Sequence, residues 1–165
     1  MAQITLGGNP VQTMGELPAV GEKAPDFTLI KDDLARVSLS DFQGSKVVLN
    51  VFPSIDTSVC AQSVREFNQR LAEKENTKVL CISRDLPFAF KRFCAAEGIE
   101  NVETLSDFES GDFGKTYQLE MTDGPFAGLH SRAVIVLDED GKVIYQQQVG
   151  EIGDEPDYKG ALAAL

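Results

Sequence analysis

The stretch KVVLNVFPSIDTSVCAQSVREFNQR, residues 46–70, predicts a buried strand, a turn and a helix in direct succession. Its first part, KVVLNVF, is short and rich in β-branched residues, as in strands that are covered on both faces. Beyond the turn, one side of the expected helix is apolar, and its side chains recur at helical spacing at Cys60, Val64, Phe67 and Leu71. The pattern therefore places Cys60 in the first turn of a helix, on its inward face.

A thiol at the start of a helix meets unpaired backbone N–H groups and the positive end of the helix dipole. Both favour the thiolate, so position alone makes Cys60 a candidate nucleophile. Pro53 lacks an N–H and fixes the turn, while Thr57 lies about one helical turn before Cys60 and can point its hydroxyl at the same place. The residues by themselves leave a second interpretation open, in which Cys60 is core packing and Thr57 only caps the helix.

The alternation of strands and helices continues along the chain. Further strands are predicted in DFTLI, KVLCIS and NVETLSD, and VSLSDFQGSK predicts a short strand or a turn that closes at Gly44. Further helices are predicted in LPFAFKRFCAAEG, GDFGKTYQ and EPDYKGALAAL. ITLGGNPVQT predicts an N-terminal β-hairpin, and RAVIVLDEDGKVIYQQQV a second hairpin that turns at Asp140-Gly141. Such an order predicts one α/β domain over residues 1–165, a layered sandwich with a mixed central sheet.

The charge balance argues against several classes of partner. The chain has 26 acidic and 15 basic side chains, a net charge of −11, which repels a nucleic-acid backbone or an anionic membrane surface. The first residues, MAQITLGGNP, carry neither a basic segment nor a long apolar run, so we expect no signal peptide and no membrane span. These observations predict a cytoplasmic protein.

Three cysteines, Cys60, Cys81 and Cys94, are an odd number that does not suit a secreted disulfide framework. Their spacing does not fit a zinc site either, so we expect no metal and no other cofactor. Cys81 lies within the apolar run VLCIS, where a cysteine behaves as a small hydrophobic residue. We therefore expect Cys81 to be core packing without a chemical role.

The spacing Pro-x-x-x-Thr-x-x-Cys at Pro53, Thr57 and Cys60 resembles the active-site signature of peroxiredoxins. The longer NVFPSIDTSVCAQSVREFN is similar to bacterial thiol peroxidases, an atypical two-cysteine group of that family, and the likeness extends through APDFTL, VLCIS, DLPFA, RFCAAEG, DGPFAGL, RAVIVLDE and EPDY. The resemblance implies a thioredoxin-like three-layer sandwich and a homodimer. It also implies antioxidant reduction of hydrogen peroxide and organic hydroperoxides to water and alcohols, with thioredoxin as the reductant.

Carried over to this sequence, the resemblance makes Cys60 the peroxidatic cysteine and Cys94 the resolving cysteine, with Pro53, Thr57 and Arg132 completing the pocket. Peroxide would oxidise Cys60 to a sulfenic acid, which Cys94 would convert to an intramolecular disulfide. A disulfide needs Cα atoms about 4.4–6.8 Å apart, whereas cysteines on two different helices typically lie farther apart. We therefore expect the first turn around Cys60 to unwind in each cycle.

Some of the same residues also occur in other classes of protein. His130 with Cys60 could form a cysteine hydrolase, although one histidine without an orienting partner is more simply a surface-loop residue. ESGDFGKT ends like a phosphate-binding loop but has Glu109 where the first glycine is required. A disulfide oxidoreductase would need a Cys-x-x-Cys pair, which the chain lacks. A docking protein without activity would not need the set of Pro53, Thr57, Cys60 and Arg132.

Overall fold

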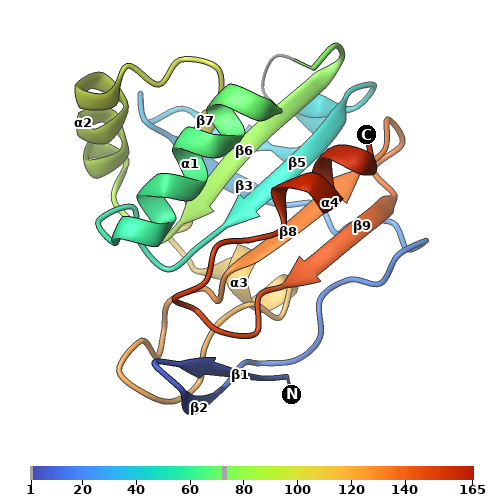
Figure 1. The fold of residues 1–165 in the computed structure, drawn as a ribbon. Helices are drawn as coiled ribbons and strands as arrows, with labels where there is room; N and C mark the ends of the chain where they lie inside the picture. The colour runs from blue at the N-terminus through green and yellow to red at the C-terminus, as the bar shows by residue number, and fades with distance from the viewer. Residues whose placement is uncertain (1, 72–73) are drawn as a thin grey trace.

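The fold is a seven-stranded mixed sheet between two layers of helices and loops, with a separate two-stranded hairpin (Figure 1). The structure is a computed structural model that describes residues 2–71 and 74–165. The sheet has the order β4-β3-β7-β6-β5-β8-β9. Its strands are β3 (Thr28–Lys31), β4 (Arg36–Ser38), β5 (Lys46–Val51), β6 (Thr77–Ser83), β7 (Glu103–Ser106), β8 (Ala133–Leu137) and β9 (Val143–Gln148). The hairpin consists of β1 (Gln3–Leu6) and β2 (Asn9–Gln12).

The helices divide between the two faces of this sheet. α1 (Ser58–Arg70), α2 (Pro87–Glu97) and α4 (Tyr158–Ala163) contribute to the apolar cluster on one face, and α3 (Asp112–Thr116) to the cluster on the other (Figure 1). A short 3₁₀ helix, η1 (Leu39–Phe42), follows β4. The expected three-layer sandwich, mixed sheet and N-terminal hairpin are confirmed.

The strand predicted at residues 46–52 is β5, and it lies in the middle of the sheet. It pairs in parallel with β6 and antiparallel with β8, so Val48, Leu49 and Val51 are fully buried. Because β8 runs in the opposite direction, Val51 at the end of β5 lies opposite Ala133 at the start of β8. The turn after β5 and the residues just before β8 therefore meet at one edge of the sheet.

Helix α1 begins and packs as its periodicity predicts. Cys60, Val64, Phe67 and Leu71 all have no exposed surface, and burying a side chain such as Phe67 stabilises the fold by about 2–3 kcal/mol. The face of α1 that carries Cys60 is thus fixed against the sheet over the whole length of the helix.

The ends of α2 follow the signals in the sequence. Pro87 occupies the first turn, where its missing N–H costs no hydrogen bond. Gly98 ends the helix in the left-handed conformation, with φ 65°, and its N–H donates to the Cys94 carbonyl. Cys94 therefore lies in the last turn of a well-defined helix.

The N-terminal hairpin is held to the rest of the molecule by the segment after β9. The carboxylate of Glu151 accepts hydrogen bonds from Thr5 Oγ1 and from the amides of Gly7, Gly8 and Gly153. These bonds, led by those from Gly153 and Gly8, lower the pKa of Glu151 to about 2. The main chain adds a bond of 2.9 Å from the Ile152 amide to the Thr5 carbonyl.

We predict that acid weakens the attachment of this hairpin. The pKa of Glu151 in the folded protein is below its usual value of 4.5. The hydrogen bonds of the Glu151 carboxylate therefore stabilise the fold fully above pH 4.5, and this stabilisation is lost as the pH falls through about 2. NMR titration should show the Gly8 amide shifting with a midpoint near that lower value, and Glu151→Gln should remove the titration. A midpoint near the usual glutamate value would contradict the prediction.

Candidate active site

Cys60 is the third residue of α1, and its thiol is completely buried among apolar side chains. Phe52 and Ile55 from the preceding turn belong to the same cluster. For the amides of Ser58, Val59 and Cys60, no hydrogen-bond acceptor is present among the described residues. These are the N–H groups that a helix start leaves unpaired, so they are available to an anion at this position.

Arg132 brings a positive charge directly to the sulfur. It precedes β8, and its Nη2 donates to Cys60 Sγ at 3.3 Å. Nε and Nη2 also donate to the Ile152 carbonyl, at 3.0 and 2.9 Å, which fixes the plane of the guanidinium. The prediction that Arg132 joins Cys60 thus agrees with the geometry.

The guanidinium is almost entirely out of water, since Arg132 is only 1% exposed. Burying an unpaired charge is costly, yet no carboxylate within the described parts of the chain forms an ion pair with Arg132. Nη1 is buried and has no hydrogen-bond partner there. Among the described residues, Cys60 is the only one with an ionisable side chain that is hydrogen-bonded to this guanidinium.

Thr57 occupies the N-cap position of α1, but its side chain makes no capping hydrogen bond. Its hydroxyl instead donates to the Ser54 carbonyl at 3.0 Å. Because the hydroxyl proton is used in this way, Oγ1 remains able to accept a hydrogen bond from a ligand. Pro53 is buried in the same turn and offers no N–H that would compete for that ligand.

Cys94 and Cys60 are both free thiols in this structure, and each lies within a helix. Cys94 is half-buried at the margin of the cluster that contains Cys60. Burial raises the pKa of the Cys94 thiol, and a hydrogen bond with Thr104 partly offsets that rise. The thiol therefore stays protonated until its surroundings change.

Cys81 is fully buried in the centre of β6, as expected for core packing. Burial raises the pKa of its thiol to about 12, so it is protonated at neutral pH. Asn50 Nδ2 donates to its sulfur at 3.7 Å. A protonated, inaccessible thiol is a poor nucleophile.

Comparisons with known proteins agree with this geometry. A family model described as Redoxin matches residues 19–162. The chain belongs to the Redoxin family. It is 56% identical over 165 residues to the thiol peroxidases of Corynebacterium glutamicum and Mycobacterium tuberculosis, an alignment that covers 100% of this chain and 99% of each relative.

Solved structures place this redoxin in the same fold. A peroxiredoxin-like protein from Aquifex aeolicus superposes with a TM-score of 0.93 at 36% identity, covering 99% of this chain and 95% of that one. The thiol peroxidase from Chromobacterium violaceum has a TM-score of 0.90 at 24% identity, covering 98% and 93%. The expected thioredoxin-like fold of the peroxiredoxins is therefore confirmed.

The expectation that His130 lies in a surface loop is wrong. His130 is 1% exposed, and its Nε2 lies 2.9 Å from Oδ2 of the equally buried Asp107. Its ring packs over Gly114, where an added Cβ would come within 2.7 Å of it. The histidine bonds to Asp107 rather than to Cys60, so the geometry does not support a cysteine hydrolase.

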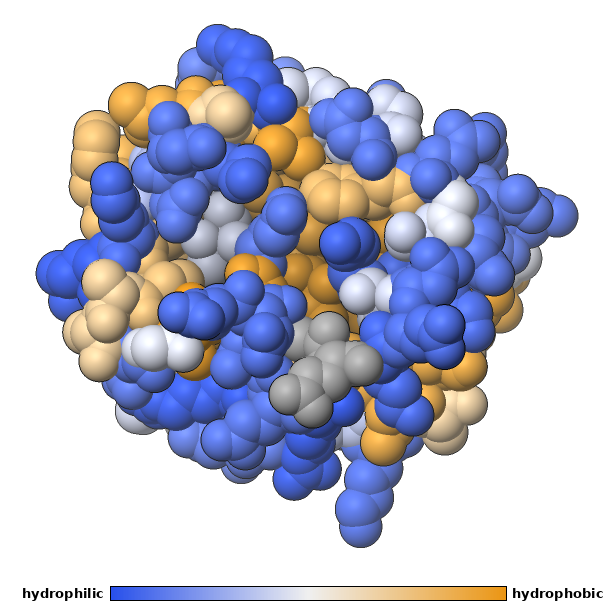
Figure 2. All heavy atoms as spheres, turned by 90° about the horizontal axis from the view of Figure 1, so that it is seen from above, coloured by the Kyte–Doolittle hydropathy of each residue, from blue (hydrophilic) through white to orange (hydrophobic). Residues whose placement is uncertain are grey.

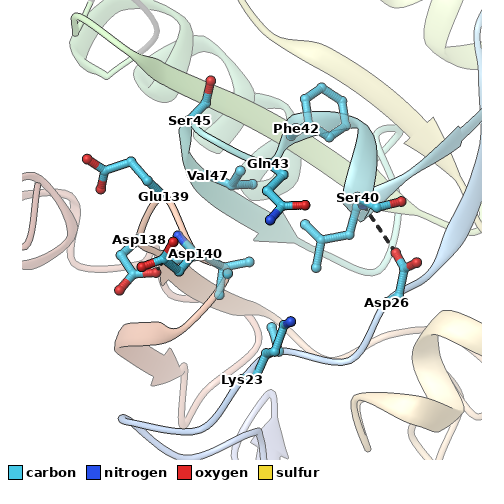
Figure 3. Close-up of a pocket in the computed structure, with 14 residues that line it drawn as sticks. Lys23, Asp26, Ser40, Phe42, Gln43, Ser45, Val47, Asp138, Glu139 and Asp140 are labelled. Carbon is cyan, nitrogen blue, oxygen red and sulfur yellow. Dashed lines mark hydrogen bonds between the residues drawn. The ribbon is translucent and has the colours of Figure 1, made fainter.

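A cavity of about 360 Å³ lies away from this site, between η1 and the β8–β9 turn (Figure 3). Val47 and Leu137 in its lining belong to the end of the β5–β8 pair opposite Cys60. No residue predicted for the active site lines it. Its rim carries Asp26, Asp138, Glu139, Asp140 and Lys23 (Figure 3).

Two groups that shape the site of this redoxin were missed in the sequence. The Ile152 carbonyl holds Arg132, and a backbone acceptor leaves no signal in the residue type. The carboxylate of Asp85 accepts hydrogen bonds from Ser54 and Ile55 in the turn before Cys60. The available signal for Asp85 was an acidic residue two positions after a buried strand and one position before Leu86-Pro87.

Removing the charge next to Cys60 should slow its reaction with hydrogen peroxide. We expect Arg132→Met to lower the second-order rate constant by about tenfold to a hundredfold, because a fixed charge at the reacting atoms is lost. The rate constant of Arg132→Lys should lie between those of wild type and Arg132→Met, since an ammonium keeps the charge but does not reproduce the planar donor set. Competition against a haem peroxidase measures the rate.

The matched control for this prediction is Arg84→Met. Arg84 is only partly buried, but like Arg132 it donates to a backbone carbonyl, that of Gly128, at 3.1 Å. We expect its rate constant to stay within about twofold of wild type, as no contact joins it to the reacting sulfur. An unchanged rate in a folded Arg132→Met variant would rule out the assigned role.

Proposed function

We propose that this redoxin is a thiol peroxidase that reduces hydrogen peroxide and organic hydroperoxides, with Cys60 as the attacking residue. The observation that carries the proposal is the Arg132 guanidinium at 3.3 Å from the Cys60 sulfur, beside the unpaired amides of a helix start. The full-length identity of 56% to thiol peroxidases supports it.

In the first step, the Cys60 thiolate attacks the terminal oxygen of the hydroperoxide. The S–O bond forms as the O–O bond breaks, so the sulfur is oxidised to a sulfenic acid and the hydroperoxide is reduced. The departing alkoxide or hydroxide takes up a proton and leaves as alcohol or water. Negative charge moves from sulfur to oxygen, and Arg132 Nη2 lies where it can stabilise both ends of that transfer.

Thr57 and Pro53 would orient the substrate and limit water. Thr57 Oγ1 can accept a hydrogen bond from the hydroperoxide O–H, because its own proton is donated to the Ser54 carbonyl. The amides of residues 58–60 can donate to the peroxide oxygens. Buried Pro53 adds an apolar wall without a competing donor.

In the second step, Cys94 attacks the sulfenic sulfur of Cys60, so an S–S bond forms and water leaves. Cys60 is fully buried and lies in the first turn of α1, while Cys94 lies in the last turn of α2. We therefore propose that at least one of these turns unwinds to bring the two thiols into bonding geometry. A dithiol reductant of the thioredoxin type then reduces the disulfide by exchange, and cytoplasmic conditions suit both the reductant and the free thiols.

The proposal that the chain forms a homodimer is supported by an apolar patch beside this site, defined by Leu86, Phe88 and Phe108. Their exposed fractions are 51%, 63% and 37%. Ser106 Oγ bonds both the Asp85 carbonyl and the Phe108 amide, which places the two segments side by side. Figure 2 shows one face of the molecule, on which hydrophobic side chains lie among hydrophilic ones. Covering such a patch with a second copy would remove apolar surface from water.

No helix in residues 2–71 and 74–165 has the length and hydropathy that crossing a membrane requires. In the same part of the chain, no group of three or more His, Cys, Asp and Glu side chains is arranged to hold a metal ion. In the proposed peroxide step, the Cys60 sulfur supplies the electrons that reduce the hydroperoxide.

The proposed function is tested by peroxide consumption with thioredoxin, thioredoxin reductase and NADPH, using hydrogen peroxide and several organic hydroperoxides. We expect Cys60→Ser to lose all turnover and Cys94→Ser to lose thioredoxin-dependent turnover while it still reacts once with peroxide. Cys81→Ala is the control and should cycle like wild type. Turnover by folded Cys60→Ser would refute the assignment.

The dimer is tested separately by light scattering on a size-exclusion column. We expect a dimer for wild type and a monomer for Phe88→Asp, because a buried unpaired carboxylate is costly at an apolar interface. Val20→Asp is the matched control, since Val20 is 61% exposed but lies outside the patch. A monomeric wild type, or a dimeric Phe88→Asp, would contradict this interface.

A further inference from the structure

The carboxylate of Asp85 holds the turn that leads to Cys60. Asp85 follows β6, and its Oδ1 accepts a hydrogen bond from Ser54 Oγ at 2.7 Å. Its Oδ2 accepts another from the Ile55 amide, also at 2.7 Å, and one from Ser83 Oγ. Hydrogen bonds to an ionised carboxylate are about twice as strong as those between neutral groups, so this turn is firmly held.

Asp85 also belongs to the segment that begins the helix of Cys94. The next residue, Leu86, is the N-cap of α2, and Pro87 is its first helical residue. The Asp85 carbonyl accepts a hydrogen bond from Ser106 Oγ of β7, and its amide donates to Ser83 Oγ at 3.1 Å. One residue therefore joins the sheet, the turn before Cys60 and the start of the helix that carries Cys94.

We propose that Asp85 is a positioning residue that latches the turn before Cys60 in its peroxide-reactive form and must release it before the disulfide can form. The inference rests on the proposed roles of Cys60 and Cys94. Unwinding the first turn of α1 moves the backbone just before it, which includes Ser54 and Ile55. These are the residues that the Asp85 carboxylate holds in place.

The latch sets a competition at the oxidised Cys60 sulfur. In one reaction Cys94 attacks the sulfenic acid, the S–S bond forms and water leaves, which requires the turn to be released. In the other, the sulfenate attacks a second hydroperoxide, a further S–O bond forms, the O–O bond breaks and an alcohol or water leaves. That reaction uses the same pocket as the first step and requires the turn to be held.

Replacing Asp85 by asparagine keeps the shape of the side chain but removes its charge. We expect Asp85→Asn to lower the rate of Cys60 oxidation by about threefold to tenfold, because the reactive turn is less well held. We expect the fraction of Cys60 lost to sulfinic acid per turnover to fall as well, by about threefold, because the disulfide forms sooner. Competition kinetics measure the rate, and intact-protein mass spectrometry the fraction.

Asp56→Asn is the matched control. Asp56 lies in the same turn and pairs at 2.8 Å with Arg92 of α2, so it joins the same two elements. This pair is exposed, with 62% and 64% of the two side chains accessible, and such pairs contribute little. We expect both measured quantities to stay within about twofold of wild type.

A second variant, Ser54→Ala, removes the bond to Asp85 Oδ1 together with the bond of 3.1 Å that Ser54 Oγ accepts from the Asp56 amide. It carries the test alone if Asp85→Asn does not fold. Ser54→Ala should lower the rate of Cys60 oxidation and the fraction of sulfinic acid, but by less than Asp85→Asn does. The double variant should differ little from Asp85→Asn alone. Additive effects, or an Asp85→Asn variant that matches Asp56→Asn, would overturn the latch while wild type still forms its disulfide. A wild type that turns over without a Cys60–Cys94 disulfide would overturn the cysteine pairing and the latch together.

Discussion

The contact between the Arg132 guanidinium and the Cys60 sulfur is the constraint on which the rest of the site depends. Arg132 is only 1% exposed, so water cannot solvate its charge. Rigid protein groups must therefore provide the hydrogen bonds of the guanidinium. The Ile152 carbonyl and the sulfur provide that support. A negatively charged group that binds beside the sulfur would offset part of the cost of burying the guanidinium.

The topology of the sheet explains how residues so far apart in the chain reach one place. β5 lies between a parallel neighbour, β6, and an antiparallel one, β8. The carboxyl ends of β5 and β6 and the amino end of β8 therefore share an edge. The turn to Cys60, the segment of Asp85 and Arg132 emerge from those three strand ends. The position of α2, the helix that carries Cys94, has the same origin, because α2 begins shortly after the end of β6.

The site has to satisfy two opposite physical demands. Fast reaction with peroxide favours a rigid pocket, whose donors are already in position when charge moves to oxygen. The proposed disulfide with Cys94 would favour a turn that can unwind, because the Cys60 thiol is buried within a helix. The hydrogen bonds that Ser54 and Ile55, in the turn before α1, donate to Asp85 would satisfy both demands, since they hold the turn and yet can exchange with water when it opens.

The sequence by itself predicted most of the elements and the inward-facing position of Cys60 at a helix start, because these follow from local sterics and periodicity. Helical spacing put Cys60 on the buried face of α1, and Pro87 and Gly98 marked the ends of α2. Only the tertiary structure decided that His130 is buried against Asp107 and that the Ile152 carbonyl holds Arg132. Those contacts join segments brought together by packing, and no local pattern of residues encodes which distant backbone or side-chain group will lie opposite.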